Sequence, residues 1–292
     1  MIDPTLYAVP FFLVTMLIES LLLARMTVGD GRQARGYEAR DTAASLTMGV
    51  GNVVINLFMK GVSLASLGFF AGFAPWKLDS DSMATWAMAL LVGDFCYYWF
   101  HRASHQVRFL WAAHVNHHSS RHYNLSTALR QSWTTPLTYI PFFWPMALAG
   151  FDPMLILIVQ AINTLYQYWI HTEAIDRLGP LEWLLNTPSH HRVHHGTNLE
   201  YLDRNHGGML IVWDRLFGTF EPEVAPVVYG LTKNIETFHP VEIATHEWKA
   251  LARDIARADD WRAAIGYVLQ PPGWSPDGST RTADQMRAAA AA

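Results

Sequence analysis

Long apolar runs that end at histidine clusters constrain the fold of this chain more than any other feature. A helix of roughly 20 apolar residues crosses a bilayer, and the run from Leu6 to Ala24 approaches that length. Thr42 to Ala74 and Met83 to Phe100 follow, and Trp133 to Gly150 and Met154 to Ile170 come after a polar segment. Hydrophobic residues make up 51% of the chain and charged residues only 16%, unlike an average soluble domain. We therefore predict an all-α fold, a polytopic membrane helical bundle.

Charged residues between these runs predict how the bundle is oriented. The positive-inside rule places basic loops on the cytoplasmic side, and four arginines follow the first run: Arg25, Arg32, Arg35 and Arg40. We expect the first run to be retained, because residues 1–4 lack the basic start of a secretory signal peptide. The second run contains several glycines, so it forms either one long helix or a kinked pair with one net crossing.

The number of crossings brings the histidines to one face of the membrane. The third run returns to the cytoplasmic side at the first histidine pair. Three prolines make the first arm of the following hairpin kinked or re-entrant, and the second arm ends at His171 on the same side. No later run is long enough to cross, so we expect a cytoplasmic helical cap from Thr172 onward. Residues 1–275 are predicted to form one membrane-embedded domain and residues 276–292 a flexible tail.

Three histidine clusters and one single histidine mark the predicted functional site. The HxxxH spacing of the first pair stacks both imidazoles on one helix face. The second and third clusters share the spacing HxxHH, in which adjacent residues diverge by about 100° and can face two different metals. The nine predicted ligands are His101, His105, His114, His117, His118, His171, His191, His194 and His195.

These nine imidazoles predict a site for two metal ions. Imidazole suits zinc, copper, iron or nickel, and a single tetrahedral zinc needs only four ligands. We predict two iron ions, because iron makes such a site an oxidant, with zinc as a redox-inert substitute in isolated protein. The single cysteine, Cys96, offers no thiolate site. His190 is either a ligand or an orienting group. The remaining histidines, predicted to be ordinary surface or capping residues, are His122, His206, His239 and His246.

Three other polar residues are predicted to be catalytic. Glu173 follows His171 by two residues and is either an acceptor for an imidazole N–H or a solvated helix-end carboxylate. Asp94 lies in the third apolar run, where an ionisable group is costly and usually functional. Gln106 directly follows His105 and is expected beside the metal site.

The composition also restricts the partners. The formal charge is -4 and the positive residues are scattered, so no nucleic-acid groove is expected. An iron oxidant held in a membrane is expected to act on a membrane lipid with O2, and it needs an electron donor. The sequence has no GxGxxG at a strand-to-helix turn and no appended haem domain, so the electrons must come from elsewhere. A non-catalytic metal-binding or transport protein would instead carry ionisable residues along a membrane-crossing path, whereas here they gather at one face.

Longer strings around the histidines resemble known enzymes. The three histidine clusters resemble the histidine boxes of the fatty acid hydroxylase/sterol desaturase superfamily, whose members are polytopic di-metal lipid oxygenases. Five strings resemble the alkylglycerol monooxygenase family more closely: residues 95–102 (FCYYWFHR), 123–132 (YNLSTALRQS), 169–173 (WIHTE), 186–196 (NTPSHHRVHHG) and 213–220 (WDRLFGTF). The resemblance runs from about residue 90 to residue 235.

This resemblance implies hydroxylation of the carbon next to the ether oxygen of an alkylglycerol, with tetrahydrobiopterin as cofactor, so that the product falls apart into a fatty aldehyde and glycerol. The chain departs from that family at Gln106, where Glu is usual, and at Arg121 and His122, where acidic residues are common. A neutral amide loses the charge-assisted part of a hydrogen bond, so we expect weak pterin dependence. Hydroxylation or desaturation of another membrane lipid, sterol-like, fatty acyl or aminolipid, stays open.

Overall fold

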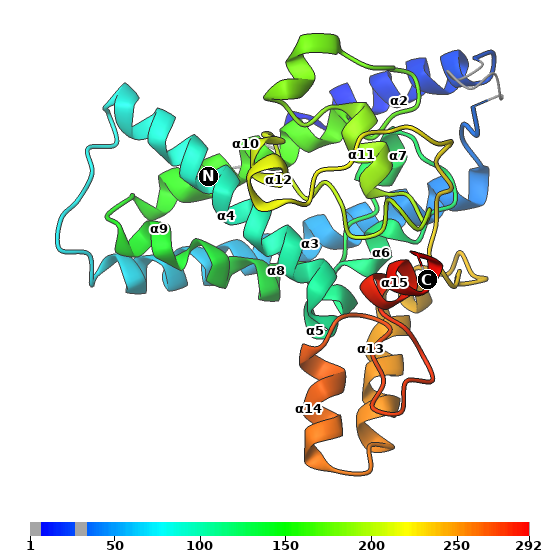
Figure 1. Ribbon diagram of the computed structural model, residues 1–292. Coiled ribbons are helices and arrows are strands. Elements are labelled where there is room, and N and C mark those ends of the chain that lie inside the picture. Colours follow the sequence, from blue (N-terminus) through cyan, green and yellow to red (C-terminus); the bar gives the residue numbers. More distant parts are fainter. Residues whose placement is uncertain (1–6, 27–33, 292) are drawn as a thin grey trace.

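The structure is a computed structural model that describes residues 7–26 and 34–291, and it is built from helices (Figure 1). Within these residues there is no β-strand, and the pairs Leu185–Leu210 and Gly196–Tyr229 form only isolated bridges. The predicted all-α fold is confirmed. Leu6 and Arg32, which the sequence analysis placed in the first apolar run and the basic loop, lie outside the described residues.

Four long helices correspond to the predicted apolar runs: α2 (Val9–Leu23), α3 (Ala39–Ala71), α4 (Met83–Gln106) and α10 (Pro153–Trp169). Among the described residues, α3 is the one helix that is both long enough and apolar enough to cross a membrane by those two measures alone. Its 33 residues span roughly 50 Å at 1.5 Å per residue. The second apolar run is therefore one long helix and not a kinked pair.

Two glycines inside α3 are required by close packing against another segment. A Cβ at Gly49 would lie 2.8 Å from the carbonyl oxygen of Leu129, and a Cβ at Gly51 would lie 2.5 Å from Nε1 of Trp133. These glycines allow the segment around residues 129–133 to approach the helix closely. They are not helix ends.

The run from Trp133 to Gly150 forms no single helix. It is divided into α8 (Thr135–Tyr139), η1 (Ile140–Phe143) and α9 (Trp144–Leu148), and each piece has a proline at its first or second position. Proline lacks the N–H that would continue a preceding helix, so the predicted kinked arm is what forms. α10 then packs against α4 and α3.

Short helices surround the ends of these long ones: α5 (Arg108–Ala112), α6 (Val115–His118), α7 (Leu125–Ala128), η2 (Gly179–Trp183), α11 (Pro188–His194) and α12 (Val212–Phe217). Helices α13 (Pro240–Ala256) and α14 (Trp261–Leu269) form a hairpin that extends from the rest of the chain in Figure 1. Arg108 joins this hairpin to α5 through Glu247 at 2.8 Å and Asp254 at 2.6 Å. The segment expected to be a flexible tail contains α15 (Ala283–Ala291), where Arg287 donates to the carbonyl of Leu202 at 2.8 Å.

Candidate metal centre

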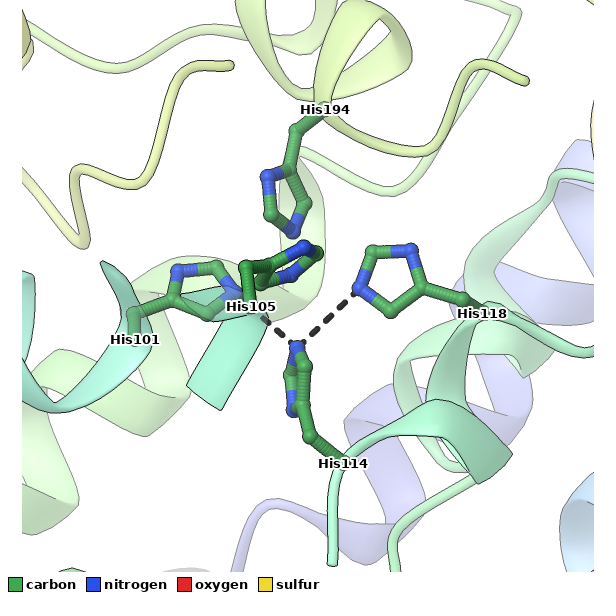
Figure 2. Close-up of side chains that lie close together, drawn as sticks. All are labelled: His101, His105, His114, His118 and His194. Carbon is green, nitrogen blue, oxygen red and sulfur yellow. Dashed lines mark hydrogen bonds between the residues drawn. The ribbon is translucent and has the colours of Figure 1, made fainter. Parts of the chain in front are cut away.

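Five histidines from three segments converge in the interior (Figure 2). α4 supplies His101 and His105, α6 supplies His118 with His114 at its N-cap, and α11 supplies His194. Their ligand atoms all lie within 4.8 Å of one another, and all five side chains are buried. We call this set the five-histidine group.

Four further histidines form a second set, the four-histidine group. It contains His117 of α6, His171 after α10, and His191 and His195 of α11 and its end. These ligand atoms also lie within 4.8 Å of one another. All nine histidines selected from the sequence are thus brought together, and adjacent residues of each HxxHH box face different groups.

Hydrogen bonds on the outer side of the rings fix how the five-histidine group is oriented. Nδ1 of His101 donates to the carbonyl of His206 at 2.9 Å, and Nδ1 of His194 donates to the carbonyl of Arg204 at 2.9 Å. Nδ1 of His105 lies 3.2 Å from Oδ1 of Asp203. A carbonyl only accepts, so the protons sit on Nδ1 and the Nε2 lone pairs point inward.

The loop of residues 203–206 supplies all three acceptors. Asp203 and Asn205 have φ of 54° and 56°, in the left-handed region that Asn and Asp tolerate best among residues other than glycine. Asn205 donates to the carbonyls of His190 and Glu221, which holds the loop against α11. A tightly turned loop is therefore what aligns three of the five imidazoles.

The inward nitrogens carry too few protons to satisfy one another by hydrogen bonds. Nε2 of His114 lies 3.1 Å from Nε2 of His101 and 3.0 Å from Nε2 of His118. A neutral imidazole carries one N–H, and that of His101 is already used on its outer side. Within the described residues, Nε2 of His105 and of His194 has no hydrogen-bond partner. Buried lone pairs that converge without protons fit a metal cation.

The four-histidine group has the same arrangement. Nδ1 of His171 donates to the carbonyl of Gln167 at 2.7 Å, and its Nε2 lies 3.0 Å from Nε2 of both His117 and His191. Nε2 of His195 has no partner among the described residues. The donor set fits a second metal ion.

Burial keeps these imidazoles neutral. Desolvation is the largest cause that lowers the pKa of His114, His118, His191, His194 and His195 well below the ordinary histidine value, and neighbouring imidazoles lower it further. The neutral ring is the form that binds a metal, so no proton has to be displaced at neutral pH.

A buried ion pair supports the second histidine box from the side of α3. Arg130, which is only 1% exposed, donates to Oδ1 of Asp41 at 2.5 Å and to Oγ of Ser119 at 2.9 Å. Ser119 directly follows His118. No sequence pattern marks this pair beyond the arginine in the string YNLSTALRQS, because the partner of Arg130 lies 89 positions earlier.

The three predicted catalytic residues occupy different environments. Asp94 is buried and accepts from the backbone N–H of Met209 and Leu210 and from Trp213, so it anchors the chain before α12. Glu173 is buried, and its Oε2 accepts the N–H of Arg35 at 3.0 Å. Gln106 is exposed at the last position of α4 and does not join the buried cluster. One residue further along a helix turns the side chain by about 100°, which takes Gln106 away from the direction of His105.

Two further histidines are buried near the groups. His190 lies on α11 and belongs to neither group, and its ring packs edge-on against Phe220 with centroids 5.4 Å apart. The prediction for His206 as an ordinary surface or capping residue is wrong. It is fully buried, and its ring centroid lies 5.1 Å from that of His105. The one sequence signal for the burial of His206 was its position in a turn-rich run just before the string WDRLFGTF.

Similarity to known proteins covers the part of the chain that carries this site. The model of the fatty acid hydroxylase family matches residues 86–219. Alkylglycerol monooxygenase of Homo sapiens is 42% identical over 270 residues, covering 92% of this chain and 59% of the relative, and that of Xenopus tropicalis is 41% identical over 257 residues, covering 88% and 57%. Ornithine lipid hydroxylase OlsE of Rhizobium tropici is 30% identical over 179 residues, covering 60% and 53%. No solved structure matches.

The chain spans about three fifths of the length of the alkylglycerol monooxygenases that it matches. The part that carries the nine histidines lies inside the family match, since the first is His101 and the last His195. Residues 86–219 of this chain therefore belong to the fatty acid hydroxylase family.

Proposed function

We propose that this chain is an integral membrane di-iron monooxygenase that oxidises the alkyl chain of an ether lipid. The observation that carries the proposal is the pair of buried histidine groups whose ligand nitrogens converge within 4.8 Å, with Nε2 of His105, His194 and His195 left without a hydrogen-bond partner among the described residues. The five-histidine group would hold one iron ion and the four-histidine group the other. Iron bound there would supply the redox chemistry that reduces O2 and oxidises a C–H bond, which zinc cannot.

The chain's own residues would orient the ligands and keep water out. The loop of residues 203–206 fixes three rings of one group, and Gln167 connects the two groups. Its side-chain oxygen accepts the hydroxyl of Tyr97 at 2.7 Å, and its carbonyl accepts from His171. The Tyr97 ring lies 5.3 Å from that of His101. Tyr123, also buried, lies 5.1 Å from His195.

Exposed apolar side chains on the long helices support a place in the membrane. Phe58 is 75% exposed, and Phe11, Leu17, Leu57 and Phe69 are each exposed as well. Large uncovered apolar surfaces of this kind mark contact with a membrane or a partner. We propose that α2, α3, α4 and the hairpin from α8 to α10 lie in the bilayer in several passes, with the histidine groups at the cytoplasmic face beneath the cap from residue 172 onward.

Alkylglycerols are the proposed substrates because the most similar relatives reported above carry that name. Hydroxylation of the carbon next to the ether oxygen gives a hemiacetal, which falls apart into a fatty aldehyde and glycerol. Another membrane lipid is the second candidate, because one relative is an ornithine lipid hydroxylase. Tetrahydrobiopterin is one proposed reductant, and the exposed position of Gln106 argues against a direct role for this residue in using it.

The test uses iron-loaded protein in lipid nanodiscs with one alkylglycerol and one ornithine lipid, and with tetrahydrobiopterin or a ferredoxin system as reductant. Mass spectrometry should detect fatty aldehyde only when iron, O2 and a reductant are present, and none from the His191→Ala variant. An ornithine lipid that gains one oxygen while the alkylglycerol stays intact would move the substrate to the second candidate. Turnover by zinc-only protein, or no oxidised lipid from fully iron-loaded protein, would contradict the proposal.

A further inference from the structure

The string WDRLFGTF (residues 213–220) contributes no histidine to the metal centre, yet it places a fully buried carboxylate close to it. Asp214 lies in α12, and its exposed fraction is 0%. Gly218 ends α12 with φ of 72°, which turns the chain back so that Thr219 donates its hydroxyl to Oδ1 of Asp214 at 2.6 Å. A short helix and a turn therefore hold one carboxylate inside the protein.

This carboxylate accepts the two consecutive N–H groups that follow the loop of residues 203–205. The N–H of His206 donates to Oδ1 of Asp214 at 2.7 Å, and the N–H of Gly207 donates to Oδ2 at 2.7 Å. A Cβ on residue 207 would lie 3.0 Å from the same Oδ2 and 2.5 Å from the carbonyl oxygen of Leu210. A glycine is therefore needed for this close approach of the backbone to the carboxylate.

The peptide group between His206 and Gly207 connects the carboxylate to a metal ligand. Its N–H points to Asp214, and its carbonyl oxygen accepts the Nδ1–H of His101 at 2.9 Å. Hydrogen bonds arranged in a chain polarise one another, and a charged acceptor strengthens the bond that it receives. The negative charge makes this carbonyl a stronger acceptor for the imidazole of His101, and the imidazole becomes a more basic metal ligand.

His194 shows the same outer hydrogen bond without a charge behind it. Its Nδ1–H donates to the carbonyl of Arg204, also at 2.9 Å. The N–H of that peptide group belongs to Asn205 and donates to the carbonyl of Thr219 at 3.0 Å. The two imidazoles thus have outer hydrogen bonds of equal length, but of the two only that of His101 leads on to a carboxylate.

Asp214 is ionised at neutral pH despite its burial. Burial raises the pKa of this carboxyl to about 6, while hydrogen bonds from Thr219, His206 and Gly207 oppose the rise. Since this pKa lies below neutral pH, most molecules carry the charge. Little solvent screens a charge in the interior, so its effect reaches the neighbouring peptide group.

We propose that Asp214 is a positioning residue for the metal of the five-histidine group, and that its charge acts on His101 through the 206–207 peptide group. The inference rests on the proposed function only in taking the five-histidine group as a metal site. The two metals then have different environments, because the outer nitrogen of His171 in the four-histidine group meets the carbonyl of Gln167 inside α10.

Metal binding by the full chain in detergent tests the proposal without turnover. Asp214→Asn keeps the size of the side chain and removes its charge. The variant should weaken one of the two iron sites on the order of tenfold, the low end for loss of a group that supports a metal ligand. Chelator competition followed by elemental analysis measures each site, and the second site should keep its wild-type affinity.

Asp94→Asn is the matched control. Asp94 is also 0% exposed and accepts two consecutive backbone N–H groups, those of Met209 and Leu210, at 2.7 and 3.1 Å. The carbonyls of those two peptide groups accept from Asn186 rather than from a histidine. Both variants should lower the melting temperature, but Asp94→Asn should leave the iron affinity of both sites unchanged.

The reduction potential separates the effect of the charge from that of a loosened loop. A nearby negative charge stabilises the ferric ion more than the ferrous ion, so Asp214→Asn should lower ferric affinity more than ferrous affinity. A tenfold difference between the two losses raises the midpoint potential of that iron by about 59 mV in a spectroelectrochemical titration. A loop that is merely loosened lowers both affinities alike, so an unchanged potential would overturn the role of the charge.

Equal weakening of iron binding by Asp214→Asn and Asp94→Asn would also overturn the proposal, because lost stability alone would then explain it. If Asp214→Asn does not fold, the wild type carries the test through deuterium fractionation at two ring N–H groups, measured by NMR with nitrogen-15 histidine. The N–H of His101, identified by the Tyr97 ring 5.3 Å away, should contain less deuterium than that of His194, as stronger hydrogen bonds do. Equal fractionation would refute the polarised bond.

Failure of the proposed function would give a different pattern. A wild-type chain that binds fewer than two metal ions would count against the di-metal site. The fractionation experiment also works on the metal-free protein, so it would still decide how Asp214 acts on His101. Two tightly bound irons without any lipid oxidation would contradict the monooxygenase and leave the binding results standing.

Discussion

The outer hydrogen bond from His105 to Asp203 offers the sharpest test of how the metal centre is built. Asp203 has φ of 54°, so a residue that tolerates the left-handed region must replace it. Asp203→Asn keeps an acceptor oxygen but removes the charge, and Asp203→Gly removes the side chain without backbone strain. The two variants therefore separate the charge from the hydrogen bond.

The expected magnitude follows from the geometry. Removing the group that accepts the outer N–H of a metal-binding histidine typically lowers metal affinity by about 10–100-fold. The 3.2 Å separation and the 28% exposure of the Asp203 side chain place it at the weak end, so Asp203→Gly should lose about tenfold and Asp203→Asn less. Only the five-histidine group should weaken, because its rings use the loop of residues 203–206 and the four-histidine group does not.

The assay is chelator competition followed by elemental analysis. Asp203→Gly should lose one iron per chain at a chelator concentration that leaves the second in place, whereas the wild type should lose both at higher concentrations. Asp259→Asn, an exposed position between α13 and α14, is the control. Loss of both metals in parallel, or wild-type affinity in Asp203→Gly, would refute the idea that this loop aligns one metal site.

Other perturbations follow from the same geometry. Arg130→Met leaves the carboxylate of Asp41 buried and unpaired, and should lower the free energy of unfolding by about 3–5 kcal/mol in a denaturation experiment; a change below about 1 kcal/mol would show that water reaches the pair. His171→Ala should reduce the metal content of the four-histidine group with the protein still inserted in the membrane, while His239→Ala, at the start of α13, should keep both metals. Gln106→Glu should leave saturation by tetrahydrobiopterin unchanged, because the side chain is exposed; stronger pterin-supported turnover in that variant would place the residue in the site after all.

The sequence by itself determined the helical class and the identity of the nine converging histidines. Apolar runs end where the histidine boxes begin, and the helical period separates adjacent residues of a box by about 100°. That separation already requires His117 and His118, and likewise His194 and His195, to face different directions, as they do in the two groups.

The tertiary structure decided how the nine divide. In both HxxHH boxes the pair four residues apart shares a group, His114 with His118 and His191 with His195, while the middle histidine joins the other group. An ideal helix does not dictate this for the second box, because His114 precedes α6 with non-helical φ and ψ of −124° and −33°. The approach of α4, α10 and α11 selects the partners of each ring.

The tertiary structure alone also decided what orients the ligands. Two of the three acceptors in the loop of residues 203–206 are backbone carbonyls, a group that every residue has and that no sequence pattern marks. The burial of His206 and the outward position of Gln106 have the same origin. Each depends on which side of a short loop or a helix end the rest of the fold covers, and distant segments of the chain supply that cover.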